Sequence, residues 1–96
     1  MSVLRESAAG KDCLVRVPGI CSADRTTTVL AHVRMTGISG MGLKSPDVFA
    51  AFCCAECHRA IDSGCANWTR AELRLMHIEG MMRTQAYWLR EGLVTI

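Results

Sequence analysis

Short apolar runs separated by turn residues make up the first half of the chain. Residues 2–9 predict one or two helical turns that end at Gly10. Residues 13–21 (CLVRVPGIC) favour extended backbone and then a Pro-Gly turn, which places a cysteine at each end of a small knuckle. Residues 26–33 (TTTVLAHV) are rich in β-branched side chains and predict a strand.

A glycine-rich stretch at residues 35–46 follows, and loops of that length are commonly functional or disordered. Residues 47–54 are apolar and predict a second strand, which completes a hairpin over about 26–54. The next residues, 55–62 (AECHRAID), suit a helix of about two turns.

A longer helix is predicted over about 70–91. Thr69 and Glu72 form a capping-box pattern at its start, and Gly92 is a stop signal. Apolar residues at helical spacing predict a core face consisting of Leu75, Ile78, Met82, Ala86 and Leu89. Three further residues widen the stripe: Met76, Met81 and Trp88. The alternative is a surface for a partner or for a homodimer.

The chain has 96 residues, which is enough for one domain with a modest core. Domains of about this size often add a metal or disulfides as staples. The N-terminus lacks a signal-peptide pattern and no apolar stretch approaches the length of a membrane span, so we expect a cytoplasmic protein without a membrane partner. In that compartment, close cysteine pairs favour metal binding over disulfides.

Four of the six cysteines form two pairs. Cys54 and Cys57 are a C-x-x-C pair at the start of a predicted helix, where the helix N-terminus favours thiolates. Cys13 and Cys21 are the obvious second pair. Four thiolates form a closed tetrahedral site for structural Zn²⁺. The order of knuckle, hairpin and helix resembles a treble-clef finger.

Alternatives remain for these cysteines. A redox C-x-x-C pair at Cys54 and Cys57 is disfavoured because the βαβ context is missing. Cys53 should point away from Cys54 and act as a small core residue, and Cys65 lies in a loop. His58 is an alternative zinc ligand in place of Cys13 or Cys21.

Three polar residues in and near the predicted hairpin are candidates for a catalytic site. His32 ends the first strand, Asp47 precedes the second, and His58 directly follows Cys57. Histidine suits a general base because its unperturbed pKa lies near neutrality. Each histidine on its own is more commonly structural, and His77 in the long helix is interpreted that way.

The stretch AHVRMTGISGMGLKSPDVFAAFCCAECHRAID resembles the HNH, or ββα-metal, endonucleases, in particular small phage and prophage members. Together with CLVRVPGIC and ELRLMHIEGMMRTQ, the resemblance covers nearly the whole chain. It implies that His32 is the general base, that Asp47 stands where the family has an asparagine that orients the base, and that His58 binds the catalytic cation. Some members have a second ligand one helical turn further on, and in this chain that position is Asp62.

One departure concerns the residue before the base, where many members carry an aspartate ligand and this chain has Ala31. A catalytic cation (Mg²⁺, Mn²⁺, Ni²⁺ or a second Zn²⁺) would therefore have few protein ligands. Arg34 and Lys44 flank the glycine-rich loop and are candidates for binding phosphates.

Charge is compatible with a polyanionic partner. The net charge is +2, and residues 1–50 carry six Lys or Arg against four Asp or Glu. An ordinary solvated surface explains this bias equally well. We therefore expect one α+β domain over 1–96, with a treble-clef, HNH-like core and an added C-terminal helix, acting as a metal-dependent endonuclease on DNA. The alternative is a catalytically silent zinc module that binds DNA or a protein, which Ala31 favours.

Overall fold

A two-stranded antiparallel hairpin forms the centre of the computed structural model, which describes residues 3–35, 37 and 45–95. Strand β1 (Val29–His32) pairs with β2 (Ala50–Cys53), so that Val29 lies opposite Cys53 and His32 lies opposite Ala50. All four residues of β2 are buried. Residues 36 and 38–44 of the loop between the strands, Lys44 among them, lie outside the described residues.

Both strands are shorter than the sequence predicts, because local turns use the flanking residues. A 3-10 turn, η1 (Arg25–Thr27), precedes β1, and the Asp24 side chain caps it by accepting from the Thr26 backbone N–H. Before β2, the Phe49 N–H donates to the Pro46 carbonyl and closes another turn. These hydrogen bonds satisfy backbone groups that would otherwise continue the ladder.

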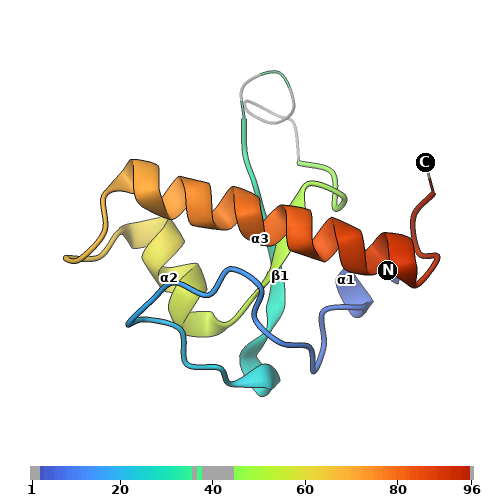
Figure 1. The fold of residues 1–96 in the computed structure, drawn as a ribbon, viewed down its shortest axis with the longest axis horizontal. Helices are drawn as coiled ribbons and strands as arrows, with labels where there is room; N and C mark the ends of the chain where they lie inside the picture. Colours follow the sequence, from blue (N-terminus) through green and yellow to red (C-terminus); the bar gives the residue numbers. More distant parts are fainter. Residues whose placement is uncertain (1–2, 36, 38–44, 96) are drawn as a thin grey trace.

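Three helices complete the fold. Helix α1 (Val3–Glu6) is a short N-terminal turn, α2 (Ala55–Ser63) follows β2 directly, and α3 (Arg70–Arg90) runs across the hairpin. Thr69 and Glu72 form the capping box at the start of α3 that the sequence predicts. Figure 1 shows α3 spanning the width of the molecule, with α2 beneath its N-terminal half and α1 near its C-terminal end.

The buried residues form two clusters. The first contains Ala31, Ala51, Leu73 of α3 and four buried cysteines, which are Cys13, Cys53, Cys54 and Cys57. The second contains Leu30, Phe52 and Trp88. Since side chains of a strand alternate between its faces, the two clusters lie on opposite faces of the hairpin. The two halves of α3 contribute to different clusters, and its middle therefore passes the edge of β2.

The middle of α3 is held closely against its surroundings. The Thr84 hydroxyl accepts from the Phe52 N–H at 3.0 Å, which satisfies an edge donor of β2. A Cβ on Gly80 would lie 2.9 Å from the Cα of Val15, so only glycine permits this approach. The segment that carries Cys13 is thereby packed on the helix.

The predicted core face of α3 is wrong. Leu75, Met82 and Leu89 are 57%, 62% and 41% exposed. The buried residues are Leu73, His77, Gly80, Thr84 and Trp88, and of these Trp88 belongs to the widened stripe that the sequence predicts. Three of these are polar or lack a side chain, so a search for apolar residues at helical spacing selects the neighbouring stripe.

The α+β class is confirmed, as a hairpin packed on a long C-terminal helix. Among the helices of the described part, none is long and apolar enough to cross a membrane.

Candidate metal centre and histidine site

Four cysteine sulfurs come together at the start of α2. The Sγ atoms of Cys13, Cys21, Cys54 and Cys57 all lie within 4.8 Å of one another. The Cys21 and Cys54 sulfurs are 3.9 Å apart. In a tetrahedral zinc–thiolate site with Zn–S bonds of about 2.3 Å, the sulfurs are about 3.8 Å apart. The donor set and its spacing therefore fit a structural Zn²⁺ ion.

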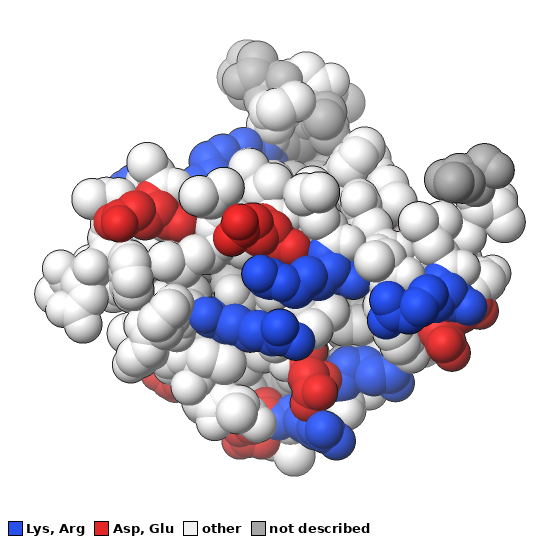
Figure 2. Space-filling view, in the orientation of Figure 1, with Lys and Arg blue, Asp and Glu red and all other residues white. Residues whose placement is uncertain are grey.

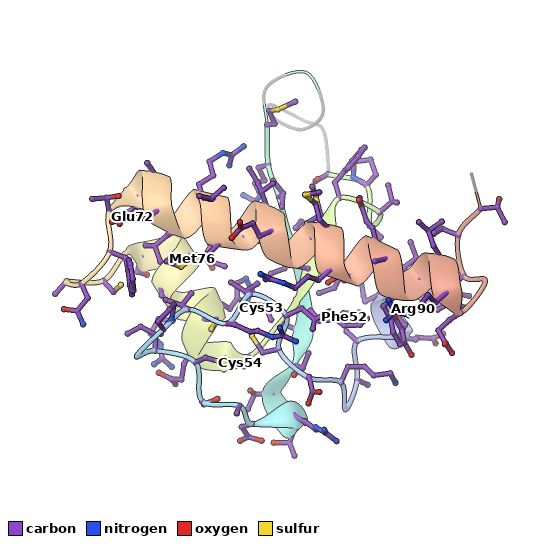
Figure 3. The ribbon with its side chains drawn as sticks, in the orientation of Figure 1. Phe52, Cys53, Cys54, Glu72, Met76 and Arg90 are labelled. Carbon is purple, nitrogen blue, oxygen red and sulfur yellow. The ribbon has the colours of Figure 1, made fainter. Side chains whose placement is uncertain are left out.

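Local backbone structure positions each ligand. A turn closes the knuckle, where the Cys21 N–H donates to the Val17 carbonyl at 2.9 Å. Cys54 is the N-cap of α2, and its sulfur accepts from the Cys57 N–H at 3.5 Å. The helix N-terminus thus directs partial positive charge at the cluster. Figure 3 shows Cys54 where β2 passes into α2.

The surroundings lower the pKa of two of the four cluster thiols, Cys13 and Cys54, and raise the pKa of the other two. Hydrogen bonds from Cys53 and then Cys57 lower the pKa of Cys13, and the same bonds raise the pKa of both donors. Burial acts to raise the pKa of Cys54, but hydrogen bonds from Cys57 and Ser22 outweigh it and lower that pKa. Burial raises the pKa of Cys21. Further thiolates therefore require a bound cation.

The remaining cysteines lie outside the four-sulfur group. Cys53 is fully buried, and its sulfur lies 3.5 Å from the Cys54 carbonyl oxygen. Cys65 is half-buried and forms an isolated β-bridge with Trp68. His58, the alternative zinc ligand, is also outside the group.

His32 and Asp47 are in direct contact. The Nε2 of His32 lies 2.6 Å from Oδ1 of Asp47, and the side chains are 24% and 18% exposed. Since a carboxylate only accepts, Nε2–H is the donor, and a neutral ring then keeps Nδ1 as a proton acceptor. Arg5 of α1 reaches the same Asp47 oxygen at 3.5 Å. The sequence gives no local signal for Arg5, because 42 positions separate it from Asp47.

On α2, His58 pairs with Asp62, and their side-chain atoms lie 3.5 Å apart on an exposed surface. The nearby His77 is buried and donates from Nε2 to the Ala31 carbonyl at 2.9 Å. Burial lowers the pKa of His77, although the bond to Ala31 opposes the shift. A neutral, hydrogen-bonded histidine in this position agrees with a structural role.

The structure does not bring all predicted site residues to one point. Ala31 faces the cluster that includes α2 residues, and His32, the next residue of β1, faces the other side of the hairpin. Among the described residues, the four-cysteine group is the one set of three or more ligand atoms close enough to hold a metal. Arg34 is exposed, and its carbonyl accepts from Arg74. The roles of His32, Asp47, His58, Asp62 and Arg34 stay predictions.

A hairpin packed on a long helix, with four clustered cysteines at the start of a shorter helix, defines a small α+β domain with a candidate metal centre. A family model described as "Putative nuclease YbcO" matches residues 2–93, and the chain belongs to this family.

Relatives share nearly the whole chain. The "Putative nuclease YbcO" of Escherichia coli (strain K12) is 43% identical over 94 residues, which is 98% of each chain. The "Putative nuclease ybcO" of Enterobacteria phage 82 has the same identity and coverage. A solved structure described as a "putative bacteriophage protein from Escherichia coli str. K-12 substr. MG1655" superimposes with a TM-score of 0.79 at 38% identity, covering 94% of this chain and 100% of that one.

Proposed function

We propose that this chain is a metal-dependent endonuclease of the HNH type that hydrolyses phosphodiester bonds in DNA, with a treble-clef zinc site that holds the fold. The family name supports nuclease activity. The single observation that carries the proposal is the contact of 2.6 Å between His32 and Asp47. A histidine whose ring is oriented by a carboxylate is the arrangement expected of a general base.

In this proposal, His32 removes a proton from the attacking water through Nδ1. Asp47 fixes the tautomer and stabilises the imidazolium that forms, because both ring nitrogens are then donors. His58 and Asp62 are the candidate ligands of a divalent cation on α2. Since His32 faces the other side of the hairpin, a substrate strand would have to pass from one face to the other to meet both. When bound, such a cation polarises the scissile phosphate and stabilises the leaving oxygen.

The rival is a zinc module that binds DNA or a protein without cleaving. Ala31 supports it, since the position that precedes the base offers no ligand. The described residues also lack a second group of three ligands for a catalytic cation. On this view, the histidines serve only structure.

Plasmid nicking by purified, zinc-loaded protein separates the two functions. The nuclease should convert supercoiled DNA to nicked circles when Mg²⁺, Mn²⁺, Ni²⁺ or added Zn²⁺ is supplied. A protein that retains its fold and its zinc, yet cuts supercoiled, single-stranded and branched DNA with none of these cations, would establish the silent module.

We also propose that two copies of the chain associate through α3. Leu75, Met82 and Leu89 recur every seven residues and are exposed, as in a helix that pairs with another helix. Light scattering after size exclusion should give the mass of a dimer, and Met82→Glu should give a monomer with unchanged circular dichroism. A wild-type monomer at high concentration contradicts the dimer and leaves the nuclease proposal intact.

A further inference from the structure

A basic groove lies between residues 11–16 and the C-terminal half of α3. Its volume is about 380 Å³. Its cationic lining residues are Lys11, Arg16, Arg83 and Arg90. Tyr87 contributes a partly exposed aromatic ring, and the buried Phe52 lies behind it in an edge-to-face contact. Figure 2 shows several Lys and Arg side chains on this face with Asp and Glu side chains beside some of them, and Figure 3 places Phe52 and Arg90 on the same side.

The groove is lined by four cations and one carboxylate. Four cations concentrate there in a chain whose net charge is +2. Asp12, the acidic lining residue, pairs with Arg25 at 2.5 Å. In the described part of the chain, none of the four cations lies within 4 Å of a carboxylate. Such a concentration of like charge favours a polyanion.

A hydrogen bond and one close backbone contact join the two walls of the groove. Arg83 donates to the Leu14 carbonyl at 2.8 Å, and Arg16 donates to the Cys13 carbonyl at 3.4 Å. The close approach of Gly80 to Val15 fixes the separation of the two walls. Each guanidinium has five N–H groups, so one hydrogen bond to the backbone leaves further donors.

Arg16 also has an unusual backbone. Its φ is 55°, in the left-handed region that favours glycine. An exposed arginine in such a conformation persists only because its surroundings hold it, and residues of this kind often serve function. This conformation places the Arg16 guanidinium among the cations that line the groove.

We propose that this groove binds single-stranded nucleic acid, with phosphates on the cationic rim and a base against Tyr87. Grooves that combine Lys and Arg with an aromatic surface bind single strands by this chemistry, which depends strongly on salt. The inference rests on the proposed nuclease function, because it assigns the surface that holds the substrate strand. It uses residues separate from His32, Asp47 and His58.

Fluorescence anisotropy with a labelled single-stranded oligonucleotide, without added divalent cation, tests the groove separately from cleavage. Lys11→Gln combined with Arg90→Gln removes two charges of the groove, one half-buried and one exposed. The matched control, Arg59→Gln with Arg70→Gln, removes two exposed arginines elsewhere. Each lost phosphate contact should weaken binding roughly fivefold at 0.1 M salt, so the groove variant should bind about 25-fold more weakly with a shallower salt dependence. Equal affinities for the two double variants would overturn the proposal.

Two further variants distinguish a binding role from a structural one. Arg16→Gly should weaken binding while stability is kept or improved, because glycine relaxes the backbone at this position. Tyr87→Leu should weaken binding more than Tyr87→Phe, which retains the ring. If Arg16→Gly leaves affinity unchanged, or if duplex or base-free polyphosphate binds as tightly as single strands, the proposal is wrong.

The two proposals fail in different ways. Binding through the groove without nicking rejects the nuclease and retains the groove. Normal nicking by the Lys11→Gln, Arg90→Gln variant, with unchanged affinity, rejects the groove and retains the nuclease. Parallel DNA and RNA oligonucleotides then identify the preferred strand.

Discussion

The four-cysteine cluster and the His32–Asp47 pair differ in how completely each is assembled. The cluster has four sulfurs within 4.8 Å of one another, and three of its four cysteines are buried. The histidine pair is a single contact of 2.6 Å between partly exposed side chains. Closed, four-ligand sites are typical of structural metals, whereas reactive sites keep open positions for water and substrate.

The contrast indicates that the four-cysteine cluster stabilises the fold, whereas the His32–Asp47 pair is the proposed site open to water and substrate. One face of the hairpin packs against the metal cluster, and the other carries His32. Substitutions at the cluster should therefore change stability, while substitutions at His32 should change activity alone.

Removing one metal ligand should have the largest effect. Serine is a good N-cap, so Cys54→Ser preserves the capping of α2 while it removes a thiolate. Zinc binding in finger peptides contributes about 10–16 kcal/mol, comparable to the ~5–15 kcal/mol stability of a whole domain. We expect Cys54→Ser to lose zinc, measured by elemental analysis, and to lose its cooperative melting transition.

Cys53→Ser is the matched control, since Cys53 is a buried neighbour outside the ligand group. It should keep one zinc per chain, although burying a hydroxyl there should lower the melting temperature. The ligand assignment would be reversed if Cys53→Ser lost zinc and Cys54→Ser kept it.

A smaller effect, confined to activity, is expected at the histidine pair. His32→Ala should reduce nicking by about 10²–10⁴-fold, the usual contribution of a general base, with melting and zinc content close to those of wild type. Asp47→Asn should keep far more activity than Asp47→Ala, because an amide oxygen can still accept from Nε2–H.

Nicking that persists in His32→Ala would point to a different site or to a contaminant. A large loss of stability in the same variant would contradict the division between a folding region and a reactive one.

Features that depend on local spacing could be predicted from the sequence. The C-x-x-C pair fixes Cys54 and Cys57 on one turn of α2, and the T-x-x-E box marks the start of α3. Cys13 and Cys21 are the obvious second pair in the sequence, and the structure places their sulfurs with the other two.

Features that depend on tertiary contacts could not be predicted. The buried face of α3 uses His77 and Thr84, whose polar groups are satisfied by the Ala31 carbonyl and the Phe52 N–H. The spacing of apolar residues along α3 does not reveal either hydrogen bond. Arg5 reaches Asp47, and Arg83 reaches Leu14, across long sequence separations.

The smallest effect, but the sharpest in sign, is expected at Gly80, where α3 meets the segment that carries Cys13. Helix propensity alone predicts that Gly80→Ala stabilises α3 by about 1 kcal/mol. The added Cβ, however, would lie 2.9 Å from both Cα and Cγ2 of Val15, and such overpacking costs about 1–3 kcal/mol. We expect the contact to prevail, because a backbone atom cannot rotate aside, so that chemical denaturation shows a net loss of stability.

Ala86→Gly, at an exposed position of the same helix, measures the contribution of helix propensity alone. A stabilised Gly80→Ala protein would mean that α3 and the knuckle are less tightly joined than the structure indicates, and that the metal cluster is anchored chiefly through α2.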